Sequence, residues 1–130
     1  MSQPLLSASA IFGAVDLRED TVEVPEWGGS VRLVQMSAAE SMQLTREMET
    51  QEGADNGIYL MFIYSARNAD GTRIFSPDEP DPERPTAPVK WTKAIEQLRA
   101  KNFNVLNMLQ RRALALNAMT VPEKEALKKD

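Results

Sequence analysis

The sequence predicts a mainly α-helical α+β fold, in which a small N-terminal β-hairpin packs on a compact bundle of about four helices. Two segments near the N-terminus alternate apolar and polar residues with the period of a strand, and paired glycines separate them. Ser37 and Asn102 stand where helix caps are expected, ahead of segments with helical periodicity. No internal repeat or change of composition marks a second domain. We therefore expect residues 21–130 to form one α-rich domain and residues 1–20 to form a partly ordered N-terminal arm.

The predicted hairpin covers residues 21–35. Thr21 to Val24 and Val31 to Val34 alternate with period two, and the glycines between them permit the positive φ of a turn. A lone hairpin is only marginally stable in water, so it must pack on the helices or pair with another chain. Trp27, near the hairpin tip, has two interpretations: an indole packed on the helices, or an exposed anchor for a partner.

Two helices are expected directly after the hairpin. Ser37 opens a capping box, and the helix that it begins is predicted to run through Glu52 and to end at Gly53. Asp55 or Asn56 then begins a second helix. The apolar residues of this second helix extend nearly all round it, which is typical of a buried central helix.

A turn and a loop separate this first half of the chain from the second. An Asp-Gly turn at residues 68–72 leads into a short extended segment, residues 73–75. A Pro-rich acidic loop follows over residues 76–86, because four prolines there prevent a regular helix interior. We interpret this loop as stiff and solvated.

Two further helices are predicted in the second half. Proline is tolerated at early helical positions, so the segment from Thr86 to Pro88 is predicted to begin a third helix. Asn102 is expected to cap a fourth helix. The pattern leaves open whether these helices are separate or form one continuous rod over residues 88–118. A short charged helix is expected after Thr120.

Composition limits the function of the chain. The 130 residues carry 15 basic and 19 acidic side chains, a net charge of −4, so the basic footprint typical of nucleic-acid binding is missing. The first residues lack the charged and apolar regions of a signal peptide, and the longest apolar stretch, Ile58 to Tyr64, is too short to cross a bilayer. We expect no nucleic-acid partner, no membrane association and a cytoplasmic location.

The residue types also argue against catalysis. The chain has neither His nor Cys, which removes the commonest general base, the Ser-His and Cys-His nucleophiles and zinc sites built from these residues. The carboxylates of the Pro-rich loop lie in a setting that gives neither rigid geometry nor a shifted pKa. We therefore expect no catalytic residue, no metal site and no cofactor, and interpret the chain as a protein-binding module.

Five apolar residues are the candidates for partner binding. Ile11 and Phe12 lie in the N-terminal arm, which could be docked or mobile, and Trp27 lies at the hairpin tip. Met42 and Met48 belong to a Met-rich stretch, which fits either an adaptable binding face or simple core packing.

The order of the motifs is a further observation. Ala10 to Gly13 precedes an acidic stretch and the run from Val22 to Gly29, and a capped helix, a buried helix and an Asp-Gly turn follow over residues 37–75. Together with the helix over residues 104–117, this order resembles the tail assembly chaperones of long-tailed bacteriophages. The Val-Pro-Glu-Trp-Gly-Gly run is the most specific part of the likeness, whereas the Pro-rich stretch at 77–88 departs from the family's pattern.

The resemblance implies an assembly factor that acts in the host cytoplasm and is absent from the mature virion. It implies a protein that self-associates into open oligomers, coats the tape measure protein and recruits tail tube subunits. Such chaperones of siphoviruses are typically made in two lengths by ribosomal frameshifting, and Lys128-Lys129 marks a position where a slippery site could lie. The main alternative is a structural head–tail connector or tail-completion protein of the virion. A bacterial regulatory adaptor and an enzyme are further alternatives.

Overall fold

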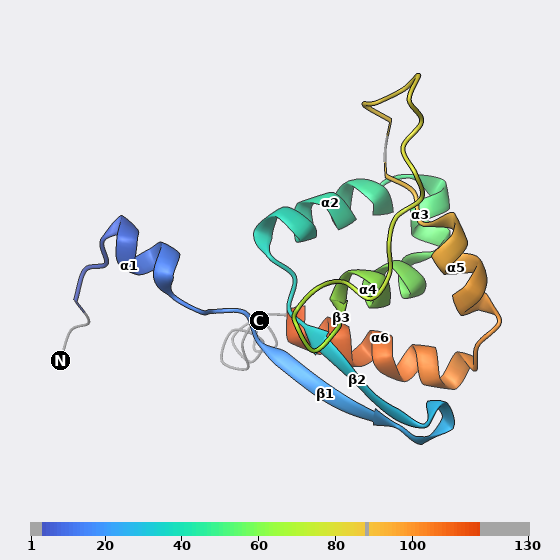
Figure 1. The fold of residues 1–130 in the computed structure, drawn as a ribbon, viewed down its shortest axis with the longest axis horizontal. Coiled ribbons are helices and arrows are strands. Elements are labelled where there is room, and N and C mark those ends of the chain that lie inside the picture. Colours follow the sequence, from blue (N-terminus) through green and yellow to red (C-terminus); the bar gives the residue numbers. More distant parts are fainter. Residues whose placement is uncertain (1–3, 88, 118–130) are drawn as a thin grey trace, which may run out of the picture.

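The computed structural model describes residues 4–87 and 89–117 of the chain, and within these residues it forms six α-helices, one 3₁₀ helix and three strands. In chain order they are α1 (Ala8–Gly13), β1 (Glu19–Val24), η1 (Pro25–Trp27), β2 (Gly29–Val34), α2 (Ala38–Met48), α3 (Gln51–Asp55), α4 (Gly57–Ser65), β3 (Ala66–Arg67), α5 (Thr92–Arg99) and α6 (Phe103–Asn117). The architecture is therefore a hairpin packed on helices (Figure 1). This architecture confirms the predicted α+β fold class.

The hairpin pairs β1 with β2 in antiparallel register, with Val22 opposite Val31. The turn contains η1 and then Gly28, whose φ of 75° lies in the left-handed region that glycine adopts without strain. β3 pairs with the other side of β2, so β1 forms a free edge of the three-stranded sheet. The sequence did not predict β3, and the predicted extended segment at residues 73–75 makes only the single bridge between Arg73 and Arg67.

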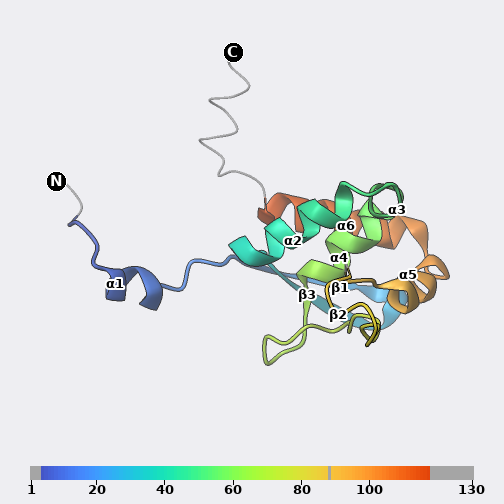
Figure 2. The same ribbon diagram turned by 90° about the horizontal axis from the view of Figure 1, so that it is seen from above.

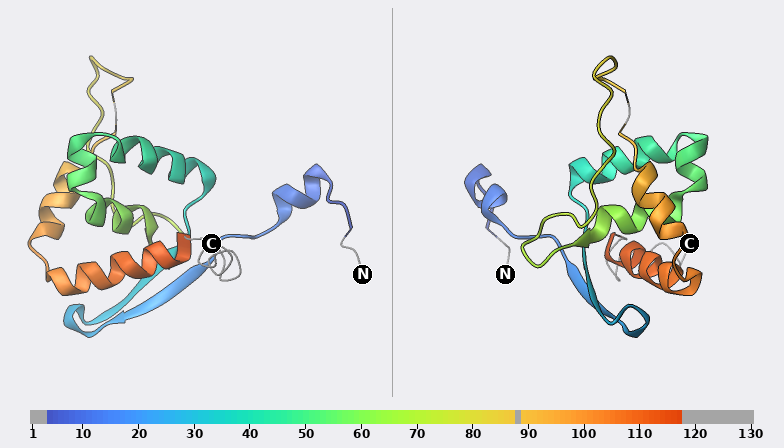
Figure 3. Two further views of the ribbon diagram at one scale, coloured as in Figure 1. Left: turned by 180° about the vertical axis from the view of Figure 1, so that it is seen from behind. Right: turned by 45° about the vertical axis from the view of Figure 1, so that its right-hand side comes forward.

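Helix α4 lies at the centre of the fold, as its apolar sequence predicted. It contacts α2, α3, α5, α6 and β2 (Figure 1), while α6 runs beside the hairpin (Figure 3). Burying apolar side chains on both sides of α4 supplies the main stabilisation of such a small domain. The most buried large side chains come from the hairpin, α4 and α6: Val24, Leu33, Phe62, Ile63, Tyr64, Leu106 and Leu109.

The predicted end of the first helix was wrong. Helix α2 begins with the predicted capping box, but it ends at Met48, and Thr50 caps a separate helix α3 that contains Gly53. Gly53 allows a close approach between backbones, because a Cβ atom there would lie 1.7 Å from the Glu47 carbonyl oxygen. The glycine therefore reports tight packing between α2 and α3 rather than a helix end.

The predicted start of the third helix was also wrong. Helix α5 begins at Thr92, well after Thr86, and residue 88 lies outside the described residues. The reason is a cap from the preceding loop: the Asp78 carboxylate accepts hydrogen bonds from the N–H groups of Thr92 at 3.0 Å and Lys93 at 3.3 Å. Because the capping residue is distant in the sequence, no local signal marks this helix start.

Helices α5 and α6 are separate rather than one rod. Asn102 stands between them, and its side-chain oxygen accepts hydrogen bonds from the N–H groups of Asn104 at 2.8 Å and Val105 at 3.3 Å. This confirms the predicted cap. The helix expected after Thr120 and the Lys128-Lys129 pair lie outside the described residues.

Replacing Asp78 with alanine is expected to lower the free energy of unfolding by about 1 kcal/mol, the usual cost of losing an N-terminal cap. Urea unfolding measures this change, and faster amide hydrogen exchange at Thr92 and Lys93 locates it. Asp81→Ala is the matched control, because the Asp81 carboxylate accepts a hydrogen bond from the Glu83 N–H within the same exposed loop and caps no helix of the described residues. Equal stability of the two variants would contradict the capping role.

Two segments project from the helices and the sheet. The Pro-rich stretch forms an exposed excursion with no helix or strand in the described residues 76–87, and it stands away from α2 (Figure 1). The N-terminal segment, residues 4–17, carries α1 away from the rest of the chain (Figure 2). None of the helices formed by the described residues combines the length and apolarity that crossing a membrane demands.

Candidate functional site

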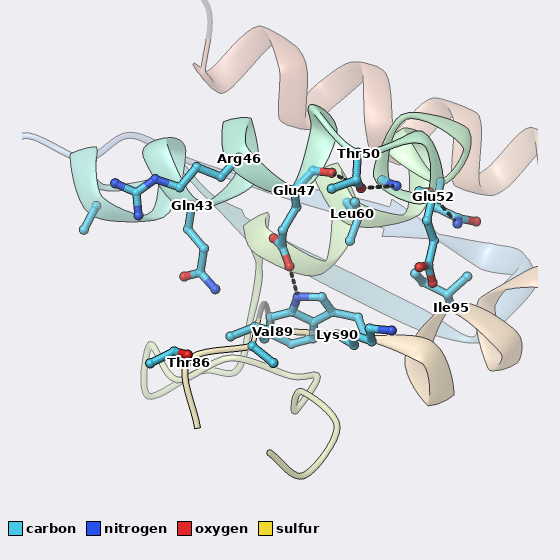
Figure 4. A pocket seen from close by; sticks show the side chains of 15 residues that line it. Gln43, Arg46, Glu47, Thr50, Glu52, Leu60, Thr86, Val89, Lys90 and Ile95 are labelled. Carbon is cyan, nitrogen blue, oxygen red and sulfur yellow. Dashed lines mark hydrogen bonds between the residues drawn. The ribbon is translucent and has the colours of Figure 1, made fainter. Parts of the chain in front are cut away.

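A groove with a volume of about 710 Å³ runs between α2 and the segment that leads into α5 (Figure 4). We call Thr86, Ala87 and residues 89–91 the strap, because they form the wall of the groove opposite α2. Leu60 of α4 contributes to the lining between the two walls. Side chains from α2, α3, the strap and α5 complete the lining, which includes Ala39, Gln43, Arg46, Glu52, Ala87, Val89, Trp91 and Ile95.

Glu47 holds the strap against α2. The carboxylate of Glu47, which is labelled in Figure 4, accepts a hydrogen bond from Trp91 Nε1–H at 2.9 Å and another from the Tyr64 hydroxyl. The Tyr64 and Trp91 rings meet edge to face, with centroids 5.5 Å apart. Burial, followed by the hydrogen bond and charge of Glu47, raises the pKa of the Tyr64 hydroxyl above its ordinary range. One carboxylate thus joins α2, α4 and the strap.

A second carboxylate, Glu40, organises the neighbouring end of α2. It accepts hydrogen bonds from the guanidinium groups of Arg67 at 2.5 Å and Arg73 at 2.7 Å. Burial by itself raises the pKa of Glu40. The Ser37 N–H and the two guanidinium groups outweigh that effect, so the pKa lies below its ordinary value.

Arg73 connects these two carboxylate clusters. Its guanidinium carbon lies 4.7 Å from the Tyr64 ring centroid and 5.5 Å from that of Trp91, which are cation–π distances. The Glu40 and Glu47 carboxylates therefore both accept hydrogen bonds from side chains of the protein itself. In the described part of the chain, His, Cys, Asp and Glu side chains do not gather in threes as a metal site would require. The arrangement gives a rigid wall for a binding groove.

A smaller recess of about 270 Å³, here named the tip cleft, lies at the hairpin loop. Trp27, Phe62 and Phe75 form its aromatic wall, with centroids 6.3 Å apart for the first pair and 5.6 Å for the second. Val31, Ile74 and the α5 residues Gln97, Leu98 and Lys101 complete the lining. Trp27 thus packs against the core and also contributes to a half-open surface.

No protein-family model matches the chain, and none of the curated proteins does. Among solved structures, the bacteriophage HK97 tail assembly chaperone is similar with a TM-score of 0.54 and 22% sequence identity, over 86% of this chain and 94% of that chain. The chain has the fold of a phage tail assembly chaperone. This finding confirms, for the fold, the resemblance that the order of motifs predicted.

Within this chaperone fold, the five candidate partner-binding residues lie in three different places. Ile11 and Phe12 project from α1, with exposed fractions of 53% and 85%. Trp27 lines the tip cleft, and Met42 and Met48 are exposed on α2 but do not line the groove. The fold therefore does not bring these residues together into one surface.

The sequence missed the groove because its walls come from segments far apart in the chain. Glu47 and Trp91 are separated by 44 residues and meet only through the fold. Gln43 and Arg46 fall on one side of α2, but they are polar and gave no apolar signal. Val89 was predicted as part of a helix and instead belongs to the strap.

Proposed function

We propose that this protein is a phage tail assembly chaperone that self-associates, coats the tape measure protein and recruits tail tube subunits. The observation that carries the proposal is the fold shared with the HK97 tail assembly chaperone over most of both chains. The open groove, the tip cleft and the exposed apolar α1 supply contact surfaces for such a role. In this proposal the protein works in the host cytoplasm and is absent from the finished virion.

The groove suits an apolar stripe on a helical partner. A tape measure protein is a long, largely helical chain, and its apolar stripes would aggregate if they were left in water. Helices bind in hydrophobic grooves through residues spaced three and four apart. Leu60, Val89 and Ile95 offer apolar contacts, while Gln43 and Arg46 on α2 can hydrogen-bond at the rim. Met42, exposed on the same helix, can extend this surface.

Coexpression with the tape measure candidate from the same gene cluster tests the proposal. The wild-type chain is expected to keep that protein soluble and to co-purify with it. With Val89→Glu, the amount of complex recovered is expected to fall at least about tenfold, because binding would bury an unpaired charge. Leu114→Glu is the matched control: Leu114 is 43% exposed on α6, against 41% for Val89, and it lies outside the groove. Circular dichroism checks that both variants fold.

Two outcomes would contradict the proposal. An insoluble tape measure protein in the presence of the wild-type chain would remove the coating role. Detection of the chain in purified, infectious particles would favour a head–tail connector or tail-completion protein instead. A longer form made by frameshifting near Lys128 belongs to the same proposal, and its test is a slippery sequence with an overlapping reading frame in the gene.

A further inference from the structure

Glu47 places a half-buried carboxylate inside the groove between α2 and the strap. Figure 4 shows this side chain extending from α2 toward the strap residues Val89 and Lys90. Leu60, which is buried, and Val89, which is exposed, add apolar surface to the same lining. A partner that fills the groove would therefore cover the Glu47 carboxylate and remove it from water.

The two donors that hold this carboxylate are neutral groups. Trp91 Nε1–H donates to one of its oxygens at 2.9 Å, and the Tyr64 hydroxyl donates to the other. A carboxylate has about four lone-pair positions, so both oxygens can still accept hydrogen bonds from further donors. The two hydrogen bonds therefore fix the position of the negative charge without cancelling it.

Positively charged side chains lie near Glu47, but they do not neutralise it. Arg73 lies over the aromatic rings that hold Glu47, and its guanidinium pairs with Glu40 at 2.7 Å. Arg46 extends along α2 away from Glu47, as Figure 4 shows. Lys90 also lines the groove, but in the described part of the chain the ion pairs include neither Lys90 nor Glu47. Within these residues, Glu47 thus has hydrogen-bond donors but no ion-pair partner.

The charge of Glu47 restricts the kind of helix that can bind in the groove. A purely apolar stripe would bury this carboxylate without a counter-ion, which is costly. A Lys or Arg within the stripe would supply the counter-ion and use the remaining lone pairs. Its apolar neighbours three and four positions away would contact Leu60, Val89 and Ile95. The long stems of Lys and Arg can pack along apolar walls while the charged group reaches the carboxylate.

We propose that the groove recognises a helix whose apolar stripe contains one Lys or Arg, and that this basic residue forms an ion pair with Glu47. This inference rests on the proposed function, which places a helix of the tape measure protein in the groove. It adds the chemistry by which the groove selects one segment of that long chain. The apolar contacts supply affinity. The ion pair supplies specificity, because a helix without the basic residue leaves the Glu47 charge buried and unpaired.

A pair of synthetic helical peptides tests this ion pair. Both carry a stripe of leucines spaced three and four apart, and they differ only at one central stripe position, which is Lys in one peptide and Gln in the other. The wild-type chain is expected to bind the Lys peptide at least about tenfold more tightly, as measured by isothermal titration calorimetry. Glu47→Gln removes the charge and can keep both hydrogen bonds, because the amide oxygen accepts from Trp91 and the amide N–H donates to the Tyr64 hydroxyl. This variant is expected to bind the two peptides equally.

Glu49→Gln is the matched control, because it makes the same change of charge at the end of α2, where Glu49 is exposed and does not line the groove. It is expected to keep the preference for the Lys peptide. Tyr64→Phe separates the charge from the rigidity of the wall, because it removes one donor to Glu47 and leaves the negative charge. It is also expected to keep the preference. Urea unfolding checks that every variant folds.

The outcomes separate this inference from the proposed function. Equal affinities of the wild-type chain for the two peptides, a preference that survives in Glu47→Gln, or no binding of either peptide would overturn the ion pair. If the coexpressed tape measure protein nevertheless stays soluble and co-purifies, the proposed function stands without the ion pair. If the tape measure protein is insoluble although the Lys peptide binds through Glu47, the proposed function fails while the chemistry of the groove is supported.

Discussion

Replacing Glu40 with alanine is expected to lower the free energy of unfolding by about 3–5 kcal/mol, the range for breaking a buried ion pair. The Arg67 side chain is only 8% exposed, so without Glu40 it keeps a buried positive charge with no counter-ion. Arg73 loses its carboxylate partner as well, and the Ser37 N–H loses its acceptor in the capping box. Urea unfolding followed by circular dichroism measures the change at pH 7.

The effect of Glu40 should depend on pH in a defined direction. Its pKa in the folded protein lies below the ordinary value of 4.5, because the Ser37 N–H and the guanidinium groups outweigh the effect of burial. A carboxylate with a lowered pKa stabilises the fold fully above its unfolded pKa, and this contribution is lost as pH falls through the folded pKa. The stability difference between wild type and Glu40→Ala is therefore expected to be constant near neutrality and to shrink below about pH 4.5.

Glu19→Ala provides the control for the Glu40 prediction. Glu19 also pairs with an arginine, Arg32, at 2.6 Å, but the two side chains are 57% and 32% exposed. Solvent-exposed pairs contribute at most about 1 kcal/mol, so this variant should lose far less stability. Equal losses in the two variants would show that the cluster around Glu40 is no more important than a surface ion pair.

Replacing Gly53 with alanine is expected to lower the free energy of unfolding by about 3 kcal/mol, at the upper end of the usual range for overpacking. The new Cβ atom would lie 1.7 Å from the Glu47 carbonyl oxygen and 2.5 Å from its carbonyl carbon. These atoms belong to the backbone at the end of α2, so the whole junction between α2 and α3 must shift. Glu47 would move with it, which loosens its hydrogen bond to Trp91. Thermal unfolding and the emission spectrum of Trp91 measure the two effects.

Gly57→Ala is the control for steric crowding at a helical glycine. A Cβ atom there would meet the Met48 terminal methyl at 2.8 Å, which is the far end of a flexible side chain. That methyl can rotate away, and alanine favours helix by about 1 kcal/mol over glycine. We expect little loss of stability or a small gain. A loss as large as that of Gly53→Ala would contradict the argument that backbone crowding is decisive.

Local patterns in the sequence were sufficient for much of the fold. The alternation on either side of the two glycines predicted the hairpin, and the spacing of Ser37 and Glu40 predicted a capping box whose two hydrogen bonds both form. Asn102 was identified as a cap in the same way. The uniformly apolar α4 was predicted to be central. In each cap the interacting groups lie within three residues of each other, so the physical cause is visible in the chain itself. The hairpin and α4 instead showed themselves through the periodicity and the apolar character of their segments.

The sequence by itself therefore determined the α+β class, the hairpin, the caps of α2 and α6 and the buried α4. It also supported the resemblance to tail assembly chaperones. Only the tertiary structure decided where α2 ends, where α5 begins and where the groove lies. Gly53 lies against the Glu47 carbonyl of another helix, and α5 begins where the distant Asp78 caps it. Glu47 and Trp91, which form one wall contact of the groove, are 44 residues apart in the sequence. These features depend on contacts between segments that meet only when the chain folds. Such contacts leave no periodic or local signal in the sequence.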